Sequence, residues 1–562
     1  GTTQVVDTSG LTLGTVTTGN LTVSSGGALD LGKGTVTGTL TATGNGAISQ
    51  ASGNGSGLTV TQAASFTQNA NGADVLLGNT NNQFNSSVTF SPAAGVEIGS
   101  LSLAATSAPG GTVTLPGAVS GNLTLNYGSS ALTVPNSIVV GGNLSMTGSD
   151  ITLNGNESTG GSQTYNGHLL LGAATVLTAT AGGVTFNGTV DNATSTTQEA
   201  LTINAAGPVA FDGAVGAIGN GALSSLTVTS TGASAGITQG GLLYVSGAST
   251  FNAGTSGAIT LGESTNQLQG PVSLTGGTVT LANSDATILG SGTVTGALTL
   301  TSAGAGGISQ ATGTTLTATG GGSITASNGA IALGNQNDLG GTFNLTGGTT
   351  QVVDTSGLTL GTVTTGNLTV SSGGALDLGK GTVTGTLTAT GNGAISQASG
   401  SGSGLTVTQA ASFTQNANGA DVLLGNANNL FSGAVSFIEG PSVQIGSLSL
   451  ANTYASTTAQ TVSLPSSLSG SLTLDYSAAP LAISASSVGG TLSVTGTSIT
   501  LNGNESSGGL QTYTGHLLLG TSATLTSTAG GVTFNGTVDN ATSTTQEALT
   551  INAAGPVAFD GA

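Results

Sequence analysis

Apolar and small polar residues alternate in short segments along the whole chain. Leu29 and Leu31 flank Asp30, for example. Alternation with a period of two is typical of a β-strand that has one buried and one wet face. Gly-Gly, Asn-Gly, Ser-Gly and Gly-Asn pairs separate the segments and supply the positive φ angles that tight turns need. The pattern predicts many short strands, and no segment has the periodicity of an amphipathic helix.

Segments of the form Leu-Thr-Val recur at a regular spacing. Leu21, Leu40 and Leu58 begin three of them at nearly equal intervals, and the pattern resumes with looser gaps at Leu123, Leu144, Leu201 and Leu226. Strands this short do not suit hairpin sandwiches but fit a parallel β-solenoid, whose coils stack about 4.8 Å apart.

We therefore expect an all-β fold, a parallel β-solenoid with about 19 residues per coil. The chain would make about 30 coils and an elongated rod on the order of 140 Å long. Leu21, Val23, Leu40 and Leu58 should form inward columns, with Phe as wider plugs and Thr and Ser on the outside.

The chain also repeats itself on a larger scale. Residues 1–78 return as residues 348–425 with one mismatch, Asn54 against Ser401, and residues 184–214 return unchanged as residues 532–562. A stack of units that touch only their neighbours tolerates such duplication, whereas a globular enzyme core does not. We expect one continuous solenoid made of a first super-repeat, residues 1–347, and a truncated second one, residues 348–562. Because Gly1 falls within a repeat, we expect the chain to be part of a longer protein.

Composition excludes several classes of partner. The chain has 21 acidic residues but only two basic ones, Lys33 and Lys380, and a net charge of −19. Binding to nucleic acid or to an anionic membrane surface needs clustered Lys and Arg, so neither is expected. No run of about 18 apolar residues predicts membrane insertion, and without Cys there are no disulfides or thiolate metal sites. Disorder is the compositional alternative, but the regular apolar spacing argues against it.

Two longer phrases recur once in each of four stretches of the chain. An Ile-Ser-Gln or Ile-Thr-Gln phrase ends at Gln50, Gln239, Gln310 and Gln397; an Asn-x-Phe or Asn-x-Leu phrase begins at Asn82, Asn266, Asn337 and Asn429. Strict alternation places each Gln side chain on the buried side, where it must be hydrogen-bonded. We predict that each Gln lies at a corner of a coil and bonds a turn backbone.

These phrases, together with strings such as residues 261–276 and 294–310, resemble the repeat region of filamentous-haemagglutinin-like adhesins. Such adhesins are the exoproteins of bacterial two-partner secretion, and the resemblance covers the whole chain. It implies a right-handed parallel β-helix, secreted to the outer surface of a Gram-negative bacterium through an outer-membrane pore. It further implies attachment to other cells, to a biofilm matrix or to host-surface glycans. No binding residue of the family can be transferred to this chain.

Candidate catalytic groups are few. His168 and His516, the only histidines, occupy equivalent Gly-His-Leu-Leu-Leu-Gly phrases, and a catalytic base would need a nucleophile and an orienting acid beside it. A strand-edge histidine without function is the default expectation. We predict no enzyme activity, no catalytic, cofactor-binding or metal site, and no cofactor.

The repeated acids are the other candidates, and we expect them to be isolated and solvated, keeping the rod soluble. Calcium at single Asp residues stays an alternative, although hard cations want several oxygens together and the tandem calcium nonapeptide is absent. The acids are Asp30, Asp74, Glu157, Asp191 and Asp212, with their copies Asp377, Asp421, Glu505, Asp539 and Asp560.

The leading hypothesis is the structural shaft of a large adhesin, which itself binds extracellular polysaccharide weakly. A carbohydrate-active β-helix enzyme is one alternative, and paired carboxylates in a groove would favour it. An ice-binding solenoid is the other, and a flat, unbroken Thr array would favour it, whereas Ser, Asn, Asp and Gly interrupt the Thr-x-Thr strands here. Asn-x-Ser/Thr sequons are plentiful and arise by chance in such a composition, so glycosylation is a minor hypothesis.

Overall fold

The computed structural model of the chain describes residues 1–106, 112–216 and 221–561. Across these residues the regular structure is all β, in short strands that run from β1 (Thr2–Asp7) to β69 (Val557–Phe559). They include no helix, and so none that could span a membrane. The strands pair in parallel, coil upon coil, in a parallel β-solenoid of about 26 turns. The fold class expected from the sequence is confirmed at this level.

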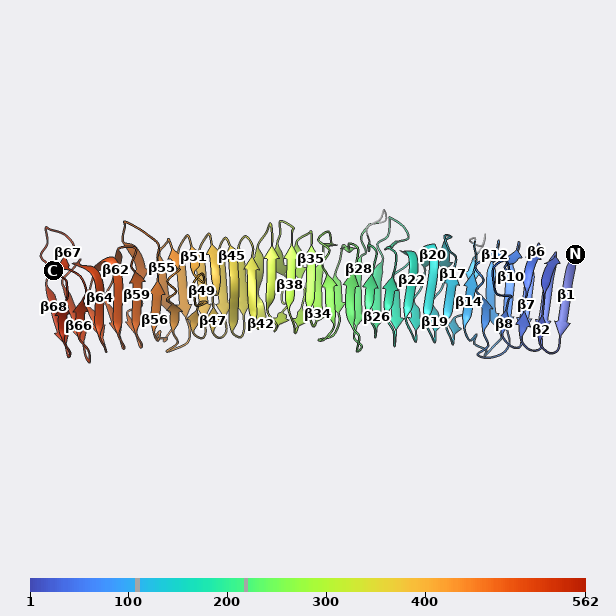
Figure 1. The fold of residues 1–562 in the computed structure, drawn as a ribbon, viewed down its shortest axis with the longest axis horizontal. Helices are drawn as coiled ribbons and strands as arrows, with labels where there is room; N and C mark the ends of the chain where they lie inside the picture. Colours follow the sequence, from blue (N-terminus) through green and yellow to red (C-terminus); the bar gives the residue numbers. More distant parts are fainter. Residues whose placement is uncertain (107–111, 217–220, 562) are drawn as a thin grey trace. The chain divides into compact units, whose positions relative to one another are not determined.

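The chain divides into two compact units, Gly1–Asp285 and Ala286–Ala562. Within each unit the strands follow one another along the stack in the order of the sequence (Figure 1). The second copy of the sequence repeat begins at Gly348, inside the second unit. The boundary between the compact units is therefore a different feature from the boundary between the sequence repeats.

The first coils of the first unit contribute one short strand to each of three parallel sheets, in the orders β1-β4-β7-β10-β13, β2-β5-β8-β11-β14 and β3-β6-β9-β12. The first sheet also contains β4 (Asn20–Ser25), β7 (Leu40–Gly44), β10 (Ala64–Gln68) and β13 (Val88–Pro92). The second is β2 (Leu11–Thr12), β5 (Leu29–Asp30), β8 (Ile48–Ser49), β11 (Val75–Leu77) and β14 (Leu101–Ala104). The third is β3 (Thr15–Thr18), β6 (Lys33–Val36), β9 (Leu58–Val60) and β12 (Gln83–Phe84).

The second unit builds the same three-strand coils from the second copy of the sequence. Leu368 pairs with Leu387 there as Leu21 pairs with Leu40 in the first unit. The corresponding strands are β46 (Leu368–Ser372), β49 (Leu387–Gly391), β52 (Ala411–Gln415) and β55 (Val435–Glu439); β47 (Leu376–Asp377), β50 (Ile395–Ser396), β53 (Val422–Leu424) and β56 (Leu448–Ala451); and β48 (Lys380–Val383), β51 (Leu405–Val407) and β54 (Leu430–Phe431).

The coil is longer than the sequence spacing predicted. It averages about 21 residues, which gives about 26 turns and roughly matches the expected 19 residues per coil. The step from Leu40 to Ala64, its partner in the next coil, is longer than the step from Leu21 to Leu40. The difference lies in loops at the corners, such as residues 50–57, which lengthen a coil without changing the strands that stack. Corner loops are therefore where this fold takes up insertions.

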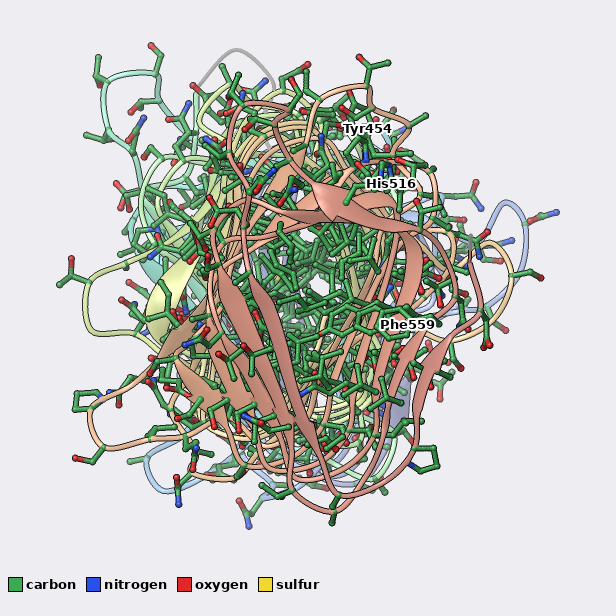
Figure 2. All side chains as sticks on the ribbon, turned by 90° about the vertical axis from the view of Figure 1, so that its left-hand side faces the viewer. Tyr454, His516 and Phe559 are labelled. Atoms are coloured by element: carbon green, nitrogen blue, oxygen red, sulfur yellow. The ribbon has the colours of Figure 1, made fainter. Side chains whose placement is uncertain are left out.

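The interior of each unit consists of apolar columns that run from coil to coil. Leu21, Val23 and Leu40 are at most 2% exposed, as predicted. Aromatic rings stack in the same way, with the Phe66 and Phe90 ring centroids 5.3 Å apart. Viewed along the stack, carbon-rich side chains fill the inside of the coils, and the labelled Phe559 lies with them, whereas oxygen and nitrogen atoms concentrate outside (Figure 2). Such stacked columns replace the single core of a globular domain.

One column was assigned wrongly from the sequence. Leu58 is buried, but it lies in β9 of the third sheet and pairs with Gly34, whereas the residue stacked on Leu40 is Ala64. The next Leu-Thr-Val segment, which begins at Leu58, follows the corner loop of residues 50–57. It lies about 19 residues after Leu40, as expected, but in a different sheet. A sequence period alone does not distinguish the sheets of a coil when the loop lengths vary.

Candidate functional site

His168 is held between two carboxylates from neighbouring coils. It lies in β22 (Gln163–Leu171), within the strand and not at its edge. Its Nδ1 is 3.0 Å from Asp150 Oδ1 on β20 (Leu144–Leu153), and its Nε2 is 2.9 Å from Asp191 Oδ2 on β25 (Val190–Asn192). Each ring nitrogen therefore has a carboxylate oxygen within hydrogen-bond distance, and neither nitrogen is turned toward open space where a substrate could meet it.

The equivalent histidine keeps only half of this arrangement. His516 in β64 (Gln511–Leu519) lies on the outer rim of the coil in Figure 2, with its Nε2 2.9 Å from Asp539 Oδ2. Ser498 takes the place of Asp150, since each pairs with the histidine of its own copy. Each of these acids lies about one coil length before or after its histidine in the sequence. A search for acids at that spacing could have identified them as partners. A catalytic group would not be expected to lose one of its partners in this way.

Glu157 and Glu505 are buried, which corrects the expectation that all the repeated acids are solvated. Both are 1% exposed, and Glu157 stacks between Ile138 and Leu177 in an inward column. Desolvation raises the pKa of each carboxyl to about 8, so both are neutral at pH 7. The alternation of β21 (Glu157–Thr159) points Glu157 inward, and the sequence reading treated every acid as an outward one.

The polar surroundings of the two buried acids differ between the copies, and only Glu505 has a side-chain hydrogen-bond partner. The Tyr165 hydroxyl donates to Gln163 Oε1 at 3.0 Å, and burial together with the nearby Glu157 raises the pKa of Tyr165 well above its usual value. In the second copy Ser486 replaces Ile138, and both its backbone N–H and its hydroxyl donate to Glu505 Oε2. These acids face the inside of the coils, so they are core groups with no access to a substrate.

Of the remaining repeated acids, four accept backbone N–H groups, three face solvent, and Asp191 is buried, which also corrects the expectation that it is solvated. Asp30 Oδ1 accepts the Gly32 N–H at 2.8 Å, and Asp74 Oδ1 accepts the Ser100 N–H at 2.7 Å. Asp377 and Asp421 repeat these bonds, Asp191 is buried beneath His168, and Asp212, Asp539 and Asp560 are exposed. Among the described residues, no three His, Cys, Asp or Glu side chains come together in a way that could hold a metal ion.

The two recurring phrases meet in space. Gln50 Nε2 donates to Asn82 Oδ1 at 2.8 Å, and Asn82 Nδ2 donates back to Gln50 Oε1 at 2.8 Å. The prediction that the glutamines are hydrogen-bonded is confirmed, but their shared partner is the side chain of an asparagine; the predicted bond to a backbone group is found for Gln239 and Gln310, at Gly241 and Asn335. The same reciprocal pair forms between Gln239 and Asn266, Gln310 and Asn337, and Gln397 and Asn429.

Each asparagine of these pairs is buried and also ties down the backbone around it. Asn82 is 0% exposed, its Oδ1 accepts the Leu58 N–H at 2.8 Å, and its Nδ2 donates to the Leu77 carbonyl at 3.0 Å. Gln50 begins the corner loop of residues 50–57, and Asn82 ends the loop of residues 78–82 in the next coil. One amide pair therefore fixes the bases of two loops on neighbouring coils.

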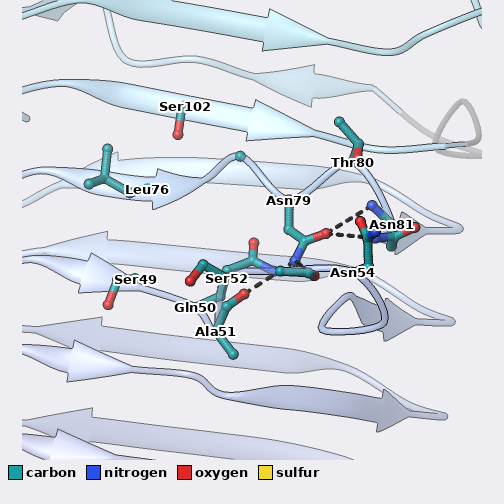
Figure 3. Close-up of a pocket in the computed structure, with 12 residues that line it drawn as sticks. Ser49, Gln50, Ala51, Ser52, Asn54, Leu76, Asn79, Thr80, Asn81 and Ser102 are labelled. Atoms are coloured by element: carbon teal, nitrogen blue, oxygen red, sulfur yellow. Dashed lines mark hydrogen bonds between the residues drawn. The ribbon is translucent and has the colours of Figure 1, made fainter.

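Above this pair the two loops border a surface groove. Its floor is an outward column in which Leu76 stands between Ser49 and Ser102, each on a successive coil (Figure 3). Leu76 is 40% exposed although its neighbours in β11 are buried. The groove encloses about 520 Å³. Its lining combines hydroxyl, amide and backbone groups with one exposed leucine and contains no charged side chain.

Hydrogen bonds between the loops give the groove a fixed wall. Asn79 Nδ2 donates to the carbonyls of Ala51 and Gly53 at 3.2 and 3.3 Å, which joins the loop of residues 78–82 to the loop of residues 50–57 (Figure 3). Asn79 Oδ1 accepts the backbone N–H of Asn81 at 3.0 Å. The groove opens beside Gly78, where an added Cβ would lie 3.2 Å from Ser102 Oγ.

The second unit repeats the groove. Leu423, which is 41% exposed, lies beside Ser449, and the loops of residues 397–404 and 425–429 form the wall. This groove encloses about 600 Å³. Asn426 Nδ2 joins the two loops through the carbonyls of Ala398 and Gly400. The sequence reading missed both grooves, because it used Leu-Thr-Val periodicity and gave no role to the loops.

A separate surface bears on the ice-binding alternative. At the positions where β4, β7, β10 and β13 pair with one another, the outward side chains all carry hydroxyls, in rows two residues apart; the outward Asn20 lies at the end of β4, beyond these rows. Gln4 and Val6 border these rows in β1, and Ile438 interrupts one of the two corresponding rows of the second unit. The hydroxyl side chains are Thr22 and Ser24, Thr41 and Thr43, Ser65 and Thr67, and Thr89 and Ser91.

Comparison with protein families identifies the class of repeat. The family described as repeats of unknown function (DUF5649) matches residues 18–91, 200–275, 276–346 and 365–438, which together make up just over half of the chain. The chain belongs to this family. Each matched segment contains one reciprocal Gln–Asn pair, so the pair is a structural mark of the repeat in this chain. Comparisons with curated proteins and with solved structures gave no match.

Proposed function

We propose that this chain is the structural shaft of a large secreted adhesin on the outer surface of a Gram-negative bacterium. The shaft is a right-handed parallel β-helix, is exported through an outer-membrane pore, and mediates attachment to other cells, to a biofilm matrix or to host surfaces. It has no enzymatic activity. The sequence resemblance to filamentous-haemagglutinin-like repeats supports this role, and right-handedness also follows from the usual hand of parallel crossover connections.

One observation carries the proposal: the second unit rebuilds the coils of the first in the same register. β46, β49, β52 and β55 stack as β4, β7, β10 and β13 do, each strand paired only with its neighbours in the adjacent coils. Duplication of such units adds length without requiring a new core. Length and repetition serve attachment at a distance from the cell, whereas a single catalytic site gains nothing from them.

The enzyme alternative receives little support from the described side chains. Glycan-cleaving enzymes need two accessible carboxyl groups on either side of a bond. Here Glu157 and Glu505 face the inside of the coils, and the nitrogens of His168 are occupied by Asp150 and Asp191. The grooves around Leu76 and Leu423 contain no carboxylate.

Ice binding is the second candidate, and the hydroxyl rows of β4, β7, β10 and β13 are the observation in its favour. One row reaches Thr114 and so spans five coils in the first unit, whereas in the second unit Ile438 ends one of the two matching rows. A measurement of thermal hysteresis on the purified chain decides this point. We expect none, because an ice-binding face needs a longer flat array.

The shaft role can be tested with a deletion that leaves every coil junction native. Removing residues 31–377 joins Asp30 to Leu378 and recreates the local sequence Asp30-Leu31 of the intact chain. In the producing bacterium we expect the shortened protein to reach the cell surface in normal amounts but to support less attachment. Unchanged attachment at equal surface amounts would refute the shaft role.

A further inference from the structure

We propose that the two equivalent grooves, around Leu76 and around Leu423, are binding sites for a neutral polysaccharide. This inference deepens the adhesin role and rests on it, since it names the ligand class and the residues that contact it. The grooves are built from matching residues in separate units, and the chemistry of their lining indicates the occupant.

The lining matches a sugar in both its polar and its apolar groups. A pyranose ring presents hydroxyls at its edge and C–H groups on its face. Leu76 supplies an exposed apolar surface on the floor, and the Ser49 and Ser102 hydroxyls stand on either side of it. The Asn81 side chain and the backbone of residues 51–54 add polar groups at the wall. A few placed polar groups around an apolar contact are typical of small-ligand sites.

Charge selects a neutral ligand over an acidic one. The lining of both grooves is uncharged, and the chain carries a net charge of −19 with only two lysines. A polyanion would meet a repulsive field and no counter-charge. A cationic ligand would find no carboxylate in either groove to pair with. A neutral glycan meets neither obstacle.

The groove is fixed before the ligand arrives. The Gln50–Asn82 amide pair holds the bases of the two loops, and Asn79 joins the loops above it. A site that is already ordered loses little conformational entropy on binding. The long loop is a local feature: seven residues separate Gln50 from Leu58, but only three separate Gln239 from Leu243, which makes the equivalent bond to its asparagine. The amide pair thus belongs to every repeat, and the groove depends on the inserted loop.

The affinity of one groove should be weak. No aromatic ring lines either groove, and binding anchors are usually aromatic or Arg side chains. A polysaccharide offers many equivalent segments, so two grooves on one chain raise the effective concentration of each contact. Weak single sites combined by repetition suit a shaft that holds a matrix.

The test uses the whole chain in affinity electrophoresis through gels that contain dextran, galactomannan or a soluble (1→3)-β-glucan, with alginate as the anionic probe. We expect at least one neutral glycan to retard the wild-type chain and alginate not to do so. The double variant Leu76→Asp and Leu423→Asp should bind roughly tenfold more weakly, because it places unpaired charges beneath a neutral ligand. Leu76→Ser with Leu423→Ser should weaken binding without adding charge.

The matched control is the double variant Val139→Asp and Ile438→Asp. Val139, in β19 (Ile138–Val140), and Ile438 are also outward apolar residues, 55% and 47% exposed, and lie outside the grooves. We expect wild-type retardation for this variant.

Three results would each overturn the proposal: groove variants that are retarded as strongly as the wild-type chain, retardation by alginate alone, or retardation by no neutral glycan. Self-association of the wild-type chain that the groove variants lose would assign the grooves to a second copy instead. The binding assay uses the purified chain, which needs no export. A failure to bind neutral glycans would therefore not change the attachment measured in the deletion strain, and the two proposals can fail separately.

Discussion

The side-chain amides of Gln50 and Asn82 hydrogen-bond to each other in both directions at 2.8 Å, although the two residues lie far apart in the sequence. The pair is polar, yet Asn82 is 0% exposed and every polar atom of its amide group has a partner. A satisfied buried network of this kind specifies one arrangement of the loops above it.

Removing one member should destabilise this corner locally. Asn82→Leu leaves the Leu58 N–H and the Leu77 carbonyl without their partner, which should cost on the order of 2–4 kcal/mol. We expect faster hydrogen exchange at the Leu58 amide, with no change at Leu405, whose bond to Asn429 is intact in the same molecule. The exposed Asn81→Ala is the matched control. Unchanged exchange at Leu58 in Asn82→Leu would show that the pair does not hold the loop.

The inward columns predict a second contrast. Leu40 is 1% exposed and stacked between Leu21 and Ala64, whereas Leu76 is 40% exposed. Leu40→Asp buries a charge and should lower the free energy of unfolding of its coil by more than about 4 kcal/mol, whereas Leu76→Asp should change it by less than about 1 kcal/mol. Urea unfolding followed by hydrogen exchange measures both. Similar losses for the two variants would place Leu40 outside the core.

The buried acids predict a dependence of stability on pH. The carboxyls of Glu157 and Glu505 have pKa values near 8 in the folded chain and 4.5 as the reference for an exposed group. Below pH 4.5 both states hold the proton; between pH 4.5 and 8 only the folded state does, so the free energy of unfolding falls as the pH rises. The loss should reach on the order of 4 kcal/mol for each acid and level off above pH 8.

Glu157→Gln with Glu505→Gln should remove this slope, because an amide does not titrate. The check is a series of urea unfolding curves from pH 4 to pH 9 for both proteins. If the free energies of unfolding of the two proteins change in the same way with pH, burial does not keep either acid neutral.

The close spacing of neighbouring coils leaves no room for a side chain at Gly34. Gly34 has a φ of +129°, and a Cβ there would collide with the Val16 carbonyl of the preceding coil; Gly381 repeats this geometry at +132°. Gly34→Ala should lower the stability of its coil by about 2 kcal/mol or more. Gly14→Ala is the control, since nothing lies within 4 Å of an added Cβ there. Equal thermal stability of the two variants would contradict this reading of the coil contact.

The sequence predicted the fold because the physics that sets it is local and repeated. Alternation in segments such as Leu21-Thr-Val23 defines the buried face, and the near-verbatim copy at Leu368 requires units that touch only neighbours. The predicted number of residues per coil was slightly low and the predicted column of Leu58 was wrong, because the loop of residues 50–57 has no periodic signal. Both the coil length and the column of Leu58 depend on loop length, which the strand pattern does not show.

The candidate site was harder to predict for the same reason. Gln50 and Asn82 were both noticed, but their contact depends on two loops that bring together residues in different coils. Glu157 was read as an outward acid because composition counts charges and does not show the face that a strand turns inward. Leu76 was not singled out, since an outward leucine is recognisable only once its register with Ser49 and Ser102 is known.

The most direct measurement compares the binding of the whole chain and of the chain lacking residues 31–377 to one immobilised neutral polysaccharide. The deletion keeps native coil junctions and retains the groove around Leu423 while removing the one around Leu76. If repetition of weak sites on an inert stack is the basis of function, the shortened chain should bind roughly 10- to 100-fold more weakly, and neither protein should release sugars. Equal affinity of the two proteins, or the appearance of new reducing ends, would contradict the account.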